Sequence, residues 1–220
     1  MTSQQDQMIA IAMPGAGWAL EGVFLGGADS DPDPVLSSLR ETSGAVVAAP
    51  HPLYGGSMDS PVVAELCFAC RRAGYATVRF NWRGVGASGG APSGDPAQAD
   101  ADYAAALAYL EETVAGPILA AGYSFGAAAA VRVVRANPRV RRLLLVAPPP
   151  ALLDAAALAQ FRGSALIVVG SRDSFAPTAE LAQLLGDGER RRLEVIPDAD
   201  HFFMCGLGDI SRIAREWLEA

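Results

Sequence analysis

The sequence predicts an α/β fold in which a mostly parallel central sheet carries helices on both faces. Several short segments are apolar throughout instead of alternating, which is typical of strands that are buried on both faces. Stretches with apolar residues at helical spacing fall between them, and this alternation favours a parallel sheet. The predicted strands are residues 44–50, 76–80, 117–122, 143–149, 164–170 and 193–197.

The remaining elements follow in order along the chain. The segment AMPGAGWALEGVFLGG, residues 12–27, predicts an antiparallel hairpin around Gly15 at one edge of the sheet. Only PPPALLDAAALAQFRG lies between the apolar run LLLVAP and the strand SALIVVG at 164–170, so we expect a short helix and a loop there. The predicted helices are residues 60–74, 97–115, 125–136, 177–186 and 207–219.

Length and composition indicate one compact domain. A chain of 220 residues can bury about 70% of the surface that it exposes when unfolded. Hydrophobic residues make up 51% of the chain and charged residues 19%, which is typical of globular proteins. We find no internal repeat and no linker, so a single domain is expected over residues 1–220.

Charge and residue inventory exclude several classes of function. A net charge of −7 without a basic stripe argues against nucleic acid as a partner. All 17 basic residues are arginine, which excludes lysine Schiff bases, pyridoxal phosphate attachment and a phosphate-loop lysine. Neither a secretory signal nor a sufficiently long apolar run is evident, so we expect a cytoplasmic protein that does not bind membranes.

The cysteines and histidines suggest neither a disulfide framework nor a metal site. Three cysteines are an odd number and fit a reducing compartment. Cys67 and Cys70 form a C-x-x-C in the middle of a predicted helix, whereas a redox pair needs a helix N-terminus. His51 and His201 lack the spacing of zinc ligands, so no metal is expected.

Two serines match the pattern G-x-S-x-G, which carries the nucleophile in a sharp strand-turn-helix elbow. Ser124 follows the apolar strand PILAAG and precedes the helical segment FGAAAAVRVVRA, as an elbow requires. Ser88 runs instead into GGAPSGDP, a segment rich in turn residues. The sequence therefore favours Ser124 as a nucleophile.

The loop around Ser88 also matches a dinucleotide-binding pattern, Gly84-x-Gly86-x-x-Gly89. That pattern binds pyrophosphate only where it opens a helix, and here prolines and glycines follow it. We interpret it as a structural turn, and no cofactor is expected.

A serine nucleophile needs a base and a carboxylate that orients the base. His201 and Asp173 each lie just after a predicted strand, and the chain order Ser124, Asp173, His201 is typical of α/β-hydrolases. The sequence favours Asp173 as this carboxylate and His201 as the base. The alternatives are that Asp173 caps the helix beginning near Pro177, with Asp198 or Asp200 in its place, and that His201 is a surface histidine.

From about residue 44 to 216 the chain resembles the α/β-hydrolase superfamily, and within it the compact bacterial hydrolases related to dienelactone hydrolase. The resemblance rests on HPLYGGSMDS, RFNWRGVGASGG, GYSFGA, GSRDSFAP and DADHFF. It implies an α/β-hydrolase fold with little or no cap domain. Two positions depart from the family. Dienelactone hydrolase has a cysteine at the position of Ser124, so its particular substrate does not carry over. Many relatives have an aspartate where this chain has Asn81, and the sequence alone does not show what that exchange changes.

The resemblance also implies where a developing oxyanion would be bound. One donor is the N–H of Phe125, which follows the nucleophile. The second comes from the loop after the strand at 44–50, where His51-Pro52 replaces the family's histidine-glycine pair. Proline has no N–H, so the second donor is expected at Leu53 or Tyr54, and His51 is expected to be structural.

These observations predict a serine carboxylesterase that acts on small or exposed esters through an acyl-enzyme. The short connection before residue 164 implies an open, shallow site. Aromatic residues on the neighbouring loops are expected to line the site, with burial in the core as the alternative for each of them. These residues are Tyr54, Trp82, Tyr123, Phe202 and Phe203. The competing hypothesis is a non-catalytic α/β-hydrolase-fold protein that binds a ligand, and a homodimer is possible.

Overall fold

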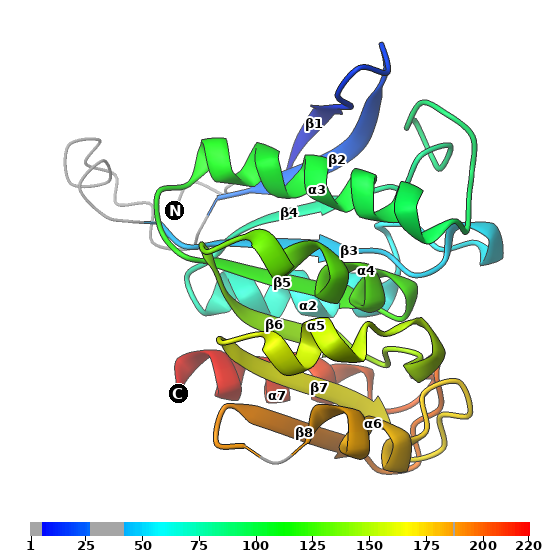
Figure 1. Ribbon diagram of the computed structural model, residues 1–220, viewed down its shortest axis with the longest axis vertical. Coiled ribbons are helices and arrows are strands. Elements are labelled where there is room, and N and C mark those ends of the chain that lie inside the picture. The colour runs from blue at the N-terminus through cyan, green and yellow to red at the C-terminus, as the bar shows by residue number, and fades with distance from the viewer. Residues whose placement is uncertain (1–5, 27–41, 187) are drawn as a thin grey trace.

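The computed structural model describes residues 6–26, 42–186 and 188–220, which form an eight-stranded sheet between helical layers (Figure 1). The strand order is β1-β2-β4-β3-β5-β6-β7-β8, and the six strands from β4 to β8 in this order pair in parallel. The predicted α/β class is therefore confirmed. The carboxyl ends of the parallel strands meet at one edge of the sheet, where loops can carry a site.

The N-terminal hairpin lies at one edge of the sheet, as predicted. β1 (Gln7–Ala12) pairs antiparallel with β2 (Ala19–Leu25), and β2 pairs antiparallel with β4. Gly15 has a positive φ of 72° in the connecting turn, which a residue with a side chain adopts only at a cost. Gly27, the last residue of the predicted segment, lies outside the described residues.

The parallel strands agree closely with the apolar runs of the sequence, except at β6. This strand begins and ends three residues earlier than predicted. The strand includes Arg141 and Arg142, although these charged residues come before the apolar run. The Arg142 guanidinium packs over the Trp217 ring, 5.2 Å from the ring centroid, so a charged residue is accommodated there. At the other end, prolines 148–150 have no N–H to continue the ladder. The strands are β3 (Gly44–Ala48), β4 (Ala76–Phe80), β5 (Ile118–Tyr123), β6 (Val140–Val146), β7 (Ser164–Gly170) and β8 (Arg191–Ile196).

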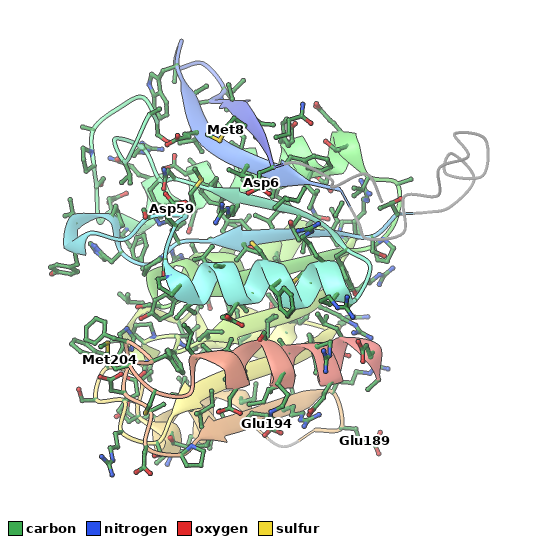
Figure 2. All side chains as sticks on the ribbon, turned by 180° about the vertical axis from the view of Figure 1, so that it is seen from behind. Asp6, Met8, Asp59, Glu189, Glu194 and Met204 are labelled. Carbon is green, nitrogen blue, oxygen red and sulfur yellow. The ribbon has the colours of Figure 1, made fainter. Side chains whose placement is uncertain are left out.

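Helices cover both faces of the sheet. α2 (Pro61–Arg72) and α7 (Leu207–Glu219) lie side by side on the face seen in Figure 2. The described helices show no stretch both long and apolar enough to cross a bilayer. The opposite face carries α3 (Pro96–Thr113), α4 (Phe125–Val133), α5 (Ala155–Gln160) and α6 (Thr178–Leu185), and short 3-10 turns form η1 (Pro52–Tyr54), η2 (Val134–Ala136) and η3 (Pro150–Leu152).

The two cysteines of the C-x-x-C pair lie inside α2 and face the core. Cys67 and Cys70 are both buried. Burial raises the pKa of the Cys67 thiol to about 12 and that of Cys70 well above its ordinary value. Because the thiolate is the reactive form, these side chains act as small apolar core residues.

Ser88 and Asn81 fasten the N-terminal hairpin to the body of the sheet. Ser88 Oγ donates to the Asn81 carbonyl at 2.9 Å and accepts from the Glu21 N–H at 2.9 Å. The Asn81 side-chain amide donates to Glu21 Oε2 at 2.8 Å, while its oxygen accepts from the Met58 N–H at 2.8 Å. The second G-x-S-x-G therefore has a structural role. Its glycine-rich loop ends before α3 begins at Pro96, so it does not open a helix.

Replacing Asn81 with Asp tests why this chain carries an amide at that position. Asn81→Asp removes the donor to Glu21 and places a second carboxylate beside it, so we expect a loss of about 1–3 kcal/mol in the free energy of unfolding at pH 7. Acidification should restore part of this loss, because one protonated carboxyl group can again donate. Urea midpoints at pH 7 and pH 5 measure both effects. Equal midpoints for the two proteins at pH 7 would contradict the assignment.

Candidate active site

Ser124 lies in a strained turn between β5 and α4. Its φ of 55° and ψ of −115° are unusual for a residue with a side chain and cost about 1–3 kcal/mol. The surrounding backbone holds it in place: its N–H donates to the Val146 carbonyl at 2.8 Å. The turn places Ser124 at the carboxyl edge of the sheet, directly after the end of β5.

The two glycines of the motif are required by close approach of the backbone. A Cβ at Gly122 would lie 2.4 Å from the carbonyl carbon of Gly126. A Cβ at Gly126 would lie 2.5 Å from the carbonyl oxygen of Ala49, at the end of β3. Any other residue would push α4 away from β5 and β3, so the pattern around Ser124 follows from packing.

Three side chains form a continuous hydrogen-bonded chain at this edge. Ser124 Oγ lies 3.0 Å from His201 Nε2, and His201 Nδ1 lies 2.8 Å from Asp173 Oδ2. All three residues are buried or nearly so. With Nδ1 donating to the carboxylate, Nε2 is left as an acceptor for the serine hydroxyl. The structure thus brings together the three residues that the sequence singled out.

Asp173 is also fixed from its other side. Its Oδ1 accepts from the N–H groups of Phe175 and Ala176, both at 2.8 Å. Asp173 does not cap α6, which begins at Thr178 without a side-chain cap. Its bonds to its own loop and its contact to His201 coexist, one on each carboxylate oxygen. The alternatives face elsewhere: Asp198 pairs with Arg172, and Asp200 accepts N–H groups within its own turn.

Two aromatic residues that the sequence offered as lining are buried instead. Trp82 is only 1% exposed, and its indole N–H donates to the carbonyls of Ala49 and Pro50 at 3.1 and 3.0 Å. The Tyr123 hydroxyl donates to the His201 carbonyl at 2.7 Å. Burial, with smaller contributions from Asp173 and another carboxylate, raises the pKa of Tyr123, so it keeps its proton. Both residues support loops of the site, and neither is free to line it.

The loop after β3 also differs from the expectation. The Leu53 N–H donates to His51 Nδ1 at 3.2 Å, and the Tyr54 N–H donates to the His51 carbonyl at 3.1 Å. Both candidate second donors are thus used inside the turn that begins η1. Phe125 differs, because it lies in the first turn of α4, where amides have no partner within the helix.

His51 has the structural surroundings that were expected of it. Its ring centroid lies 4.6 Å from that of Tyr54 and 4.6 Å from that of Phe125. Partial burial lowers the pKa of His51, which favours the neutral ring. A neutral ring is also what the bond from Leu53 requires, since only an unprotonated Nδ1 can accept it.

Apolar side chains around the three residues are open to solvent. Tyr54 and Phe202, both predicted at the site, are exposed, whereas Phe203 is buried in the core. Figure 2 shows Met204 at the carboxyl end of the strands and Glu189 at the opposite end. The exposed apolar residues on the loops after β3, β7 and β8 are Leu53, Tyr54, Phe175, Phe202 and Met204.

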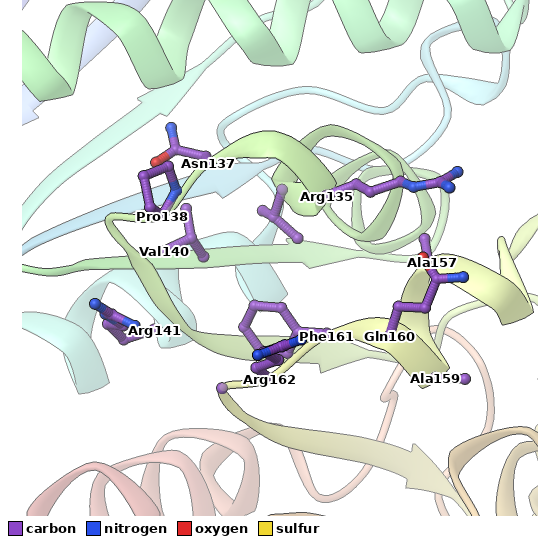
Figure 3. A pocket seen from close by; sticks show the side chains of 12 residues that line it. Arg135, Asn137, Pro138, Val140, Arg141, Ala157, Ala159, Gln160, Phe161 and Arg162 are labelled. Atoms are coloured by element: carbon purple, nitrogen blue, oxygen red, sulfur yellow. The ribbon is translucent and has the colours of Figure 1, made fainter.

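One groove in the described part of the chain has no lining residue in common with the predicted site. Its volume is about 1060 Å³, and Figure 3 shows it where β6 and β7 begin, beside the end of α5. Its lining includes Phe161 and the arginines 135, 141 and 162, and none of the predicted site residues.

Comparisons with known proteins agree with this geometry. Residues 54–206 match the sequence model of the alpha/beta hydrolase domain. Over 185 residues the chain is 30% identical to the uncharacterized protein RP471 of Rickettsia prowazekii, covering 79% of this chain and 77% of that one.

Two solved structures extend the comparison to the whole fold. An alpha-beta serine hydrolase homologue from Coxiella burnetii has a TM-score of 0.82 and 28% identity, covering 99% of both chains. A serine hydrolase without a lid from Xanthomonas campestris has a TM-score of 0.79 and 26% identity, covering 98% of this chain and 96% of that chain. The short connection between β6 and β7 fits a fold with little or no cap.

The pKa of His51 leads to a prediction about stability and pH. Because burial lowers it in the folded state, the unfolded chain takes up more protons as the pH falls. The stabilisation is therefore complete above the ordinary value of 6.5 and is lost as the pH drops below it. His51→Asn keeps an acceptor for Leu53 but does not titrate. Between pH 7 and pH 5 the urea midpoint should fall more for the wild type than for this variant, and parallel curves would contradict the prediction.

Proposed function

This chain belongs to the α/β hydrolase family, and on that premise we propose that it is a serine carboxylesterase with the triad Ser124, His201 and Asp173. One observation carries the proposal: the hydroxyl of an elbow serine lies 3.0 Å from an imidazole nitrogen, and the other nitrogen lies 2.8 Å from a buried carboxylate. A serine hydroxyl becomes a good nucleophile when such a base takes its proton.

The first half of the reaction acylates Ser124. His201 Nε2 takes the hydroxyl proton as Ser124 Oγ attacks the ester carbonyl carbon, and the carbonyl oxygen becomes an oxyanion. Asp173 stabilises the imidazolium that forms and keeps the ring in the orientation that the attack needs. The imidazolium then gives its proton to the alcohol oxygen as the carbon–oxygen bond breaks, which releases the alcohol.

The second half regenerates the serine. A water molecule loses a proton to His201 as it attacks the acyl carbon, and the second tetrahedral intermediate collapses to free acid and Ser124. Each step uses the same imidazole, first as base and then as acid, so the geometry around His201 serves both halves. The reaction requires no cofactor.

The oxyanion would be stabilised by backbone amides. Phe125 N–H is one donor, since it immediately follows the nucleophile at the start of α4. Leu53 N–H is the second, once it turns from His51 Nδ1 toward the substrate. Each such donor contributes about 3 kcal/mol to the stability of the transition state. Release of Leu53 exchanges one hydrogen bond for a charge-assisted one, which favours the change when the oxyanion forms.

The open surface at Ser124 supports small or protruding esters as substrates. The connection from β6 to β7, which the structure describes in full, holds only η3 and α5 and so contributes no additional domain over the site. Membership of the dienelactone-hydrolase-like group of the family belongs to the proposal, with a serine in place of that enzyme's cysteine. Two further points remain predictions from the sequence. One is a cytoplasmic location, and the other is that the protein acts on a small molecule and binds neither nucleic acid nor membranes.

A fluorophosphonate probe tests the nucleophile directly. We expect labelling of the folded protein at Ser124 and none in Ser124→Ala, measured by intact mass and peptide mapping. Ser88→Ala is the matched control, because Ser88 has the same sequence pattern but bonds to the N-terminal hairpin, and this variant should be labelled like the wild type.

The variant Asp173→Asn should reduce kcat for short-chain esters by about 10³–10⁴-fold, because an amide no longer holds the imidazole in the required tautomer.

A negative result would be equally informative. If the folded wild type is not labelled and hydrolyses no short-chain ester, the esterase proposal is wrong, and a non-catalytic binding protein becomes the better description. Labelling at Ser88 in place of Ser124 would contradict the assignment of the elbow.

A further inference from the structure

Two exposed phenyl rings border the imidazole of His201. Phe175 is 59% exposed and Phe202 is 62% exposed. Their ring centroids lie 4.9 and 5.5 Å from that of His201. Rings left this open contribute little to the core, and apolar surface gathered beside a reactive group commonly marks the place where a ligand binds.

Hydrogen bonds of the main chain fix the two loop positions that carry these rings. The Phe175 N–H donates to Asp173 Oδ1, on the carboxylate whose other oxygen contacts His201. The Phe202 N–H donates to Asp200 Oδ1 at 3.1 Å. The two rings lie 6.3 Å apart and nearly perpendicular, at 74°. A ligand that docks against them therefore meets a partly ordered surface and loses less entropy on binding.

The proposed chemistry decides which part of an ester these rings would meet. When the tetrahedral intermediate collapses, His201 Nε2 donates its proton to the oxygen of the departing alcohol. That oxygen must therefore lie beside the imidazole, and the group it carries extends over the surface next to His201. The carbonyl oxygen points instead toward Phe125 and the loop at Leu53.

We infer that Phe175 and Phe202 form a leaving-group subsite that selects esters of apolar alcohols, above all those carrying an aromatic ring. The inference rests on the proposed esterase function and adds the class of alcohol to it. The nearby charged groups are engaged: Asp200 accepts N–H groups of its own turn, and Arg172 pairs with Asp198. The subsite thus presents two phenyl surfaces and no prominent unpaired charge, which favours a neutral, apolar group.

The experiment compares esters that differ only in the alcohol. Methyl acetate and benzyl acetate share the acyl group, and both release poorly acidic alcohols, so a difference in kcat/KM reports binding of the benzyl ring. Methyl phenylacetate moves the ring to the acyl side. For the wild type we expect kcat/KM to be about tenfold or more higher for benzyl acetate than for methyl acetate.

The double variant Phe175→Ala/Phe202→Ala should remove this preference. The ratio of benzyl to methyl acetate should fall by about tenfold, while the ratio of methyl phenylacetate to methyl acetate changes less than about threefold. Using ratios within one protein cancels any effect of the variant on His201 itself. Phe68→Ala is the matched control, since Phe68 is a 55% exposed phenylalanine on α2, and it should keep the wild-type ratios.

The outcomes separate this inference from the proposed function. Turnover of methyl acetate with no benzyl preference, or a preference that survives in the double variant, overturns the subsite and leaves the esterase standing. Absence of both turnover and fluorophosphonate labelling overturns both. Thermal midpoints show whether the double variant folds, and Phe175→Leu/Phe202→Leu, which keeps apolar bulk without the rings, should lose the preference only in part.

Discussion

The close approach of three backbone segments is the constraint on which the site depends. At Gly122, Gly126 and the carbonyl of Ala49 there is no room for a single additional carbon, so α4 lies directly against β5 and β3. This contact forces the chain to turn sharply at Ser124 and holds the residue at a φ that it would otherwise avoid. The packing of small residues thus fixes the position of the hydroxyl group that the proposed chemistry uses.

Hydrogen bonds between loops tie the rest of the site to that turn. Asp173 uses one oxygen for His201 and the other for the amides of its own loop. Tyr123, next to the elbow, holds the carbonyl of His201. The proposed nucleophile, base and carboxylate come from three loops that are far apart in sequence, yet each loop is bonded to another through a side chain. Displacing one of them would disturb the others.

Much of this arrangement could be predicted from the sequence, because local patterns determine it. β4 and β7 begin and end where their apolar runs do. The positions of Ser124, Asp173 and His201, each just after a strand (β5, β7 and β8), indicated that they would meet at one edge of the sheet. Other features depend on contacts between distant segments. Trp82 is buried because carbonyls of the loop after β3 accept its indole N–H, and no local pattern reveals that. Likewise, no local pattern predicts that His51 Nδ1 accepts the Leu53 N–H.

The short connection between β6 and β7 has a consequence for how fast the protein can exchange its ligands. In enzymes with a mobile lid, opening of the lid or release of product often limits the overall rate. Here η3 and α5 are all that this connection contributes, and the apolar side chains on the loops after β3, β7 and β8 are already exposed to solvent. Entry and exit of a ligand would therefore approach simple diffusion. The time that a ligand stays bound would be set by its contacts with these exposed side chains.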